Sequence, residues 1–122
     1  MAEILTQVST LKKLEVIIRP GKLDAVKKAM ATVGYTGVTI SQAEGHGNQK
    51  GTAPVTGSGA FRMEFVPKLR LEIVVAEGEA DKLVEAIAKA AQTGQPGDGK
   101  IFVYDVRDAI RIRTGERGSD AL

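Results

Sequence analysis

The chain has 122 residues, 43 % of them apolar and 26 % charged, which is the balance of one soluble globular domain. Its 17 basic and 15 acidic residues leave a net charge of +2, too small to indicate nucleic-acid binding. Cysteine is absent, which excludes disulfides and thiolate metal sites. The first residues lack the basic and apolar pattern of a signal peptide, and no apolar run approaches the roughly 20 residues of a membrane helix. We therefore expect a cytoplasmic protein without a signal peptide or membrane insertion.

The first half of the chain predicts a strand, a helix and a second strand. Residues 1–10 have no clear pattern, and we expect a flexible leader ahead of one domain over residues 11–122. Alternating apolar residues predict a strand over 12–20. An apolar stripe at helical spacing predicts a helix over 22–34, and β-branched residues predict a strand over 35–43.

The second half repeats this order. Residues 61–66 alternate between apolar and polar, Pro67 interrupts the pattern, and residues 68–76 continue as a strand. A helix is predicted over 79–94, and a last strand over 100–106.

The predicted order β-α-β-loop-β-α-β is that of an α+β, ferredoxin-like βαββαβ sandwich. Its second and third strands are hairpin neighbours, so the glycine-rich loop between them, at about residues 45–64, can lengthen without disturbing the packed layers. Loops of that length are usually functional or disordered. With 4 % aromatic residues and no tryptophan, the core is thin for a monomer, which favours an oligomer.

Two glycine-rich loops are candidate phosphate-binding sites, since glycine lets backbone N–H groups approach an anion closely. They read "GHGNQKG" and "TGQPGDGK", and each carries a lysine, Lys50 or Lys100. Neither has the spacing of a P-loop, and ordinary turns are the alternative. Arg111 and Arg113 would share one face if the segment is extended and would add two more cations, whereas the alternative is a solvated tail.

The residues do not predict an enzyme. The single histidine, His46, lies in a glycine-rich loop, where a solvated side chain is the simpler interpretation. Asp98 stands between two glycines and is predicted to form a turn rather than to act as a base. No nucleophile–base set or metal-ligand set can be assembled around them. A small nucleotide hydrolase is the alternative, because the loops suit it although a base is missing.

The run "TGQPGDGKIFVYDVRDAIRIRTGERG" resembles the C-terminal signature of PII signalling proteins. The run "KKLEVIIRPGKLDAVKKAM" is similar to their first strand and helix, and "GHGNQKG" to the start of their T-loop, so the resemblance covers about residues 12–118. It implies a homotrimeric regulator of nitrogen and carbon metabolism. ATP or ADP would bind in clefts between subunits, and 2-oxoglutarate would bind beside Mg-ATP. The T-loop would then control a transporter or a metabolic enzyme.

The resemblance also implies which residues bind ligands. Those matching the nucleotide pocket are Ile17, Thr39, Gly45, Gly47, Asn48, Gln49, Val74, Gly97, Asp98, Gly99, Lys100, Arg111 and Arg113. Of these, Arg111 and Arg113 match the arginines that the neighbouring subunit supplies. Those matching the 2-oxoglutarate site are Gln49, Lys50, Gly51 and Lys68, with Gln49 also the magnesium ligand.

Some positions depart from the family pattern. Asn48 replaces a phosphate-contacting arginine, and residues 95–96 replace a lysine and an apolar residue. Phe61 replaces the tyrosine that is uridylylated, and Gly57 the tip arginine that plugs ammonium channels, while Ser58 lies beside a serine phosphorylated in some relatives. These departures leave two alternatives: a specialised PII-like sensor of another metabolite, such as bicarbonate with AMP or ADP and a non-standard target, or a trimeric module that has lost sensing.

Overall fold

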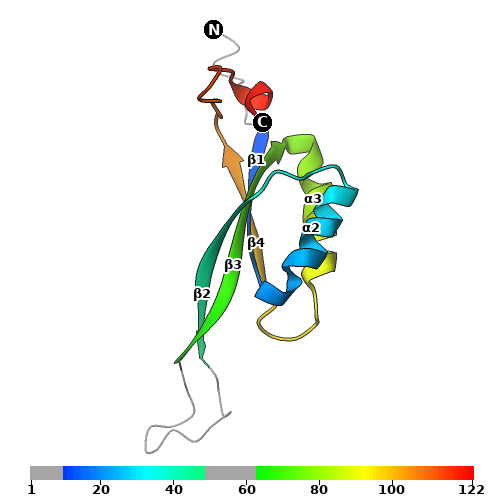
Figure 1. The fold of residues 1–122 in the computed structure, drawn as a ribbon, viewed down its shortest axis with the longest axis vertical. Helices are drawn as coiled ribbons and strands as arrows, with labels where there is room; N and C mark the ends of the chain where they lie inside the picture. The colour runs from blue at the N-terminus through cyan, green and yellow to red at the C-terminus, as the bar shows by residue number, and fades with distance from the viewer. Residues whose placement is uncertain (1–9, 49–62) are drawn as a thin grey trace, which may run out of the picture.

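The computed structural model describes residues 10–48 and 63–122. They form a four-stranded antiparallel sheet of order β2-β3-β1-β4, with the two long helices side by side on one face (Figure 1). This is the predicted ferredoxin-like α+β arrangement. The elements in chain order are β1 (Leu11–Ile18), the 3₁₀ turn η1 (Pro20–Lys22), α2 (Leu23–Thr32), β2 (Thr39–Asn48), β3 (Met63–Ala76), α3 (Glu77–Ala91), β4 (Gly99–Val106) and the 3₁₀ turn η2 (Gly118–Ala121).

The core lies between the helices and the two central strands. Strand side chains alternate between faces, and the helix-facing set is almost fully buried. Among the described residues, both long helices lie on this face and none covers the other (Figure 1). Burying each such aliphatic side chain contributes about 1.5–3 kcal/mol. The buried residues of the strands and helices include Leu14, Val16, Ile18, Leu71, Ile73, Val75, Val26, Met30, Leu83 and Ile87.

The hairpin of β2 and β3 differs from the prediction. β2 begins at Thr39 instead of residue 35, and the paired strands run on to Asn48 and back from Met63, so they occupy both ends of the predicted 45–64 loop. Pro67 does not interrupt β3. The β1–β3 ladder ends at Leu69, so β3 beyond that point has a partner on one side, and the missing N–H of proline is tolerated there.

The segment after β4 is also not the extended tail that would place Arg111 and Arg113 on one face. Residues 112–114 form a turn, closed by hydrogen bonds from Gly115 N to Arg111 O at 2.7 Å and from Arg111 N to Glu116 O at 2.8 Å. The reason is local, since a glycine with φ of 78° at position 115 lets the chain reverse.

None of the helices in the described ranges is long and apolar enough to cross a membrane.

Candidate functional site

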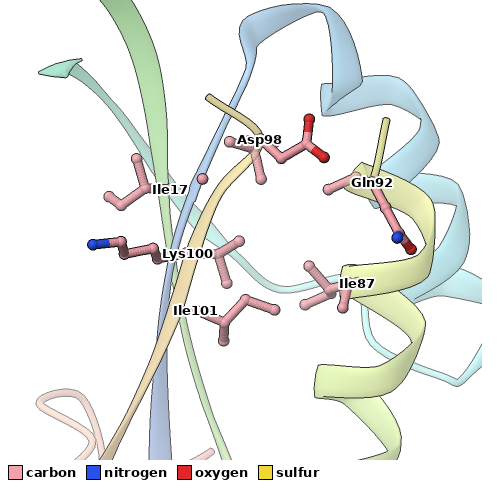
Figure 2. A pocket seen from close by; sticks show the side chains of 11 residues that line it. Ile17, Ile87, Gln92, Asp98, Lys100 and Ile101 are labelled. Atoms are coloured by element: carbon pink, nitrogen blue, oxygen red, sulfur yellow. The ribbon is translucent and has the colours of Figure 1, made fainter. Parts of the chain in front are cut away.

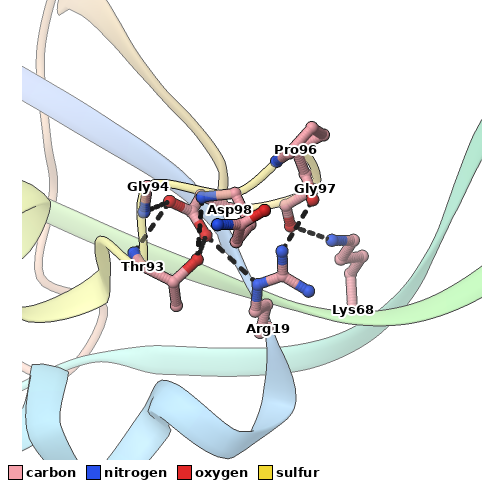
Figure 3. Close-up of polar contacts among 8 residues, drawn as sticks. Arg19, Lys68, Thr93, Gly94, Pro96, Gly97 and Asp98 are labelled. Atoms are coloured by element: carbon pink, nitrogen blue, oxygen red, sulfur yellow. Dashed lines mark hydrogen bonds and ion pairs between the residues drawn. The ribbon is translucent and has the colours of Figure 1, made fainter.

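The loop from α3 to β4, residues 92–98, is organised around the carboxylate of Asp98 (Figure 3). One oxygen accepts hydrogen bonds from the amides of Thr93 and Gly94, at 2.8 and 2.9 Å. The other accepts from the Thr93 hydroxyl and from Nε of Arg19, the latter at 3.2 Å. Asp98 therefore forms a turn, as predicted, and four donors hold it in place.

These donors keep the pKa of Asp98 far below its ordinary value of 3.8, the Thr93 hydroxyl having the largest effect, followed by the amide of the same residue. A depressed folded-state pKa gives stability that is complete above about pH 4 and is lost as the pH falls toward the folded pKa. We expect Asp98→Asn to be less stable than the wild type at pH 7, and the difference to narrow below about pH 4. Denaturant unfolding across that range checks this, with Asp81→Asn, an exposed carboxylate on α3, as control. A constant difference would contradict it.

The glycines of the loop have conformations that other residues adopt rarely. Gly97 and Gly99 have φ of 98° and 108°. A Cβ on Gly99 would lie 1.7 Å from the carbonyl oxygen of Ile17, so β4 can approach β1 this closely only with glycine. The next residue, Lys100, pairs in register with Ile17, which puts a cation directly after the loop.

A cavity of about 440 Å³ opens beside this loop, between α3, β1 and β4 (Figure 2). Ile87 and Ile101 face each other across it, and Asp98 and Gln92 supply polar side chains to its lining. Lys100 projects on the side of the sheet away from Ile101, together with Ile17 (Figure 2). Residues 93–100, the predicted phosphate-binding run that is called the phosphate loop from here on, are therefore brought together with Ile17 at one end of the sheet.

Lys68 reaches the same loop from β3. It is 9 % exposed, and its ammonium donates a hydrogen bond to the carbonyl of Gly97. A Cβ on Gly45 would lie 3.2 Å from Lys68 Cε, so a bare backbone at position 45 makes room for this side chain. Lys68 thus joins the base of the β2–β3 hairpin to the phosphate loop.

Thr39 and Val74 line a second cavity, also of about 440 Å³, where β2 begins and β3 approaches its end. Glu72 and Lys13 line it too and form an ion pair of 2.6 Å, and the Lys13 ammonium lowers the pKa of Glu72. Arg70 of β3 is the residue in register with Ile17 of β1. Val74 lies four positions farther along β3, a distance of about 14 Å. The structure therefore does not bring Thr39 and Val74 to Ile17 within one subunit.

Arg111 lies farther still. Val106, the last residue of β4, is six positions from Lys100, a distance of about 20 Å. The segment after it lies at the opposite end of the sheet from the phosphate loop (Figure 1). The Arg111 guanidinium donates to the carbonyl of Leu122 at 2.7 Å and contacts Glu116 at 3.4 Å, whereas Arg113 is exposed. The predicted cations therefore form two groups at opposite ends of one chain.

Several predicted site residues lie outside the described residues: Gln49, Lys50, Gly51, Gly57, Ser58 and Phe61. The leader is likewise outside them, except Thr10. Gly47 and Asn48 are placed by their backbone, which pairs with Glu64 and Met63. Within the described ranges, no group of three or more His, Cys, Asp or Glu side chains could hold a metal.

Sequence reasoning missed Arg19, Thr93 and Glu72. The predicted strand over 12–20 includes Arg19, whereas β1 ends at Ile18, and a cation just before the Pro-Gly pair that ends a strand was the available signal. Thr93 and Glu72 gave weaker signals, since a threonine after a helix and a charge on an alternating strand are both common. All three contact or neighbour residues that were predicted.

The sequence profile of the family described as "Nitrogen regulatory protein P-II" matches residues 11–116. The chain belongs to this family. The P-II protein of Rhodospirillum rubrum is 48 % identical over 112 residues, 92 % of this chain and 100 % of that protein. The P-II protein of Rhizobium meliloti is 49 % identical with the same coverage.

Solved P-II structures agree with the fold. Bacillus subtilis GlnK in complex with ATP matches with a TM-score of 0.78 and 36 % identity, over 92 % of this chain and 95 % of that one. Arabidopsis thaliana PII bound to citrate matches with a TM-score of 0.76 and 38 % identity, over 93 % and 94 %. P-II proteins are trimeric signalling regulators and not enzymes, which confirms the class expected from the sequence.

Proposed function

We propose that this P-II protein binds ATP or ADP in the clefts between the subunits of a homotrimer. The observation that carries the proposal is the loop of residues 93–100, which combines three glycines of positive φ, a carboxylate-held turn and a lysine at its exit. Exposed amides in such a turn, together with a nearby ammonium group, suit a polyphosphate. The relative from Bacillus subtilis, whose structure is of an ATP complex, supports the assignment.

The distances within one chain support a site shared by two subunits. Lys100 and Arg111 lie at opposite ends of the sheet, too far apart to hold one triphosphate (Figure 1). The cavity of Thr39, Glu72 and Val74 lies between them on the same uncovered sheet face. We infer that one subunit supplies the phosphate loop and a neighbour supplies the base cavity and the arginines.

The surface of β4 supports a trimer. This edge strand exposes apolar side chains on both faces, with exposed fractions of 44 % for Phe102, 51 % for Val103 and 46 % for Tyr104. An edge strand of this composition is a template for association unless another chain covers it. In a trimer, other copies of this chain would cover β4.

Lys68 supports a carboxylate ligand beside the nucleotide, 2-oxoglutarate in our proposal. A largely buried ammonium group at the hairpin base can pair with a carboxylate in place of the Gly97 carbonyl. The Arabidopsis relative is described as bound to citrate, which is itself a polycarboxylate. Mg²⁺ would be held by the phosphates together with Gln49. Magnesium is commonly bound by only one or two protein side chains, and phosphate and water supply its remaining oxygen ligands.

We further propose that the protein acts in the cytoplasm, where the loop between β2 and β3 would engage a transporter or an enzyme of nitrogen metabolism. Binding of the loop to its target would depend on which ligands are bound. A ligand shifts the equilibrium between two conformations of the loop by the difference in its affinity for them.

Titration calorimetry with ATP, ADP and AMP, each with and without Mg²⁺ and 2-oxoglutarate, tests the proposal. We expect ATP and ADP to bind at micromolar to low millimolar concentration and 2-oxoglutarate to bind only after Mg-ATP. No binding of any nucleotide would overturn the nucleotide site. Nucleotide binding without a 2-oxoglutarate effect, but with a bicarbonate effect, would instead favour the specialised PII-like sensor.

A further inference from the structure

Arg19 contacts three consecutive residues of the phosphate loop. It follows the last residue of β1, and its guanidinium donates from Nη2 to the carbonyl of Pro96 at 2.7 Å and from Nε to Asp98 at 3.2 Å (Figure 3). A Cβ on Gly97 would lie 3.2 Å from the same Nη2, so the guanidinium lies against bare backbone there. No family position named above accounts for this side chain.

Arg19 and Lys68 together determine which way the loop peptides point. The carbonyl of Pro96 faces Arg19, and the carbonyl of Gly97 faces Lys68. No described peptide bond is cis, and in a trans peptide the N–H points opposite to the carbonyl. The amide of Gly97 therefore points away from Arg19 and the amide of Asp98 away from Lys68, and within the described part of the chain neither donates a hydrogen bond.

Arg19 also offsets a charge that would repel phosphate. The pKa of Asp98 is strongly depressed, so the loop carries an ionised carboxylate at neutral pH. The Arg19 guanidinium is 35 % exposed and is the cation paired with that carboxylate. Without Arg19 the loop would present an uncompensated negative charge to a triphosphate.

We propose that Arg19 is a positioning residue for nucleotide binding: it holds the Pro96–Asp98 backbone with two amides directed at the phosphates, and it neutralises Asp98. Arg19 acts through the loop. The inference rests on the proposed nucleotide site, and it deepens that site by naming the residue that pre-forms its anion-binding backbone. Because this contribution acts on phosphate charge, it grows with the number of phosphates.

Arg19→Met tests this, with Lys28→Met as the matched control, since Lys28 is an exposed cation on α2 away from the loop. We expect Arg19→Met to weaken ATP binding about tenfold or more and AMP binding less than about threefold. Lys28→Met should change neither. Arg19→Lys keeps the charge but loses the planar two-point contact, so its ATP affinity should fall between the two.

Amide hydrogen exchange without nucleotide provides the second readout. The amides of Thr93 and Gly94 donate hydrogen bonds to Asp98, and their hydrogens should exchange faster in Arg19→Met than in the wild type. Exchange of the amides in the β1–β3 ladder should be unchanged. Unchanged loop exchange together with unchanged ATP affinity would overturn the inference, as would an equal loss for ATP and AMP. Failure of the wild type to bind any nucleotide would overturn the proposed function instead, and it would leave the exchange result to decide whether Arg19 holds the loop.

Discussion

Gly99→Ala is expected to cost at least about 4 kcal/mol of unfolding free energy, a loss that few single substitutions reach. The new methyl group would lie 1.7 Å from the carbonyl oxygen of Ile17 and 2.8 Å from its carbonyl carbon. Neither atom can move without separating β4 from β1, because Ile18 and Gly99 are paired in the ladder. The φ of 108° adds about 1–2 kcal/mol for a residue with a side chain. A small domain has about 5–15 kcal/mol in total, so much of the protein would be unfolded or unpaired at β4.

Gly94→Ala is the matched control for this loss. Gly94 belongs to the same loop and also has positive φ, 86°, but a Cβ there would meet nothing within 4 Å. We expect a cost of about 1–2 kcal/mol, that of the backbone conformation alone. Denaturant unfolding at one fixed protomer concentration measures both, since assembly makes stability concentration-dependent. Equal losses in the two variants would show that φ, and not the contact with Ile17, requires glycine at position 99.

The fold was predictable because its signals are local and mutually consistent. Leu14, Val16 and Ile18 recur at every second position and are buried against the helices, as period 2 requires. Val26 and Met30 lie on the predicted stripe of α2 and are also buried. Two strand–helix units joined by a hairpin then have few ways to pack, and the ferredoxin-like order follows.

The errors came from effects that depend on neighbours along the sheet. Pro67 breaks a strand only where its missing N–H would face a partner, and the sequence does not say that β1 ends before reaching it. The turn at residues 112–114 has a local cause instead, the positive φ of Gly115, and strand periodicity does not indicate where a glycine will reverse the chain.

The candidate site was predictable in composition but not in arrangement. Glycines and a lysine at 97–100 identified the loop, yet Arg19 is 77 residues from Pro96 in sequence, and only the fold brings them together. The resemblance implied that Arg111 reaches the pocket of Lys100 from a neighbouring subunit, and within one chain the two residues lie at opposite ends of the sheet. A site whose parts cannot meet within one subunit is a strong argument for assembly.

Mixed trimers would test that argument directly. Lys100→Ala and Arg111→Ala homotrimers should each bind ATP at least about 30-fold more weakly than the wild type, because each lacks a charge-assisted contact to the phosphates at every site. Arg113→Ala is the companion variant if removing Arg111 loosens the segment that contacts Leu122. Circular dichroism and the oligomeric state should be unchanged in all three.

Trimers that contain both variant subunits, purified through two different affinity tags, should regain binding at wild-type affinity. If Lys100 of one subunit and Arg111 of its neighbour share a nucleotide, a ring of three subunits with both types has one interface at which the two native side chains meet. Calorimetry should therefore find about one ATP bound tightly per mixed trimer. Trimers with both tags but only the Lys100→Ala substitution are the control, and they should stay weak. If the mixed trimers stay equally weak, the two cations do not form one site across a subunit boundary, and the distance of about 20 Å along β4 would then have to be closed within a single chain.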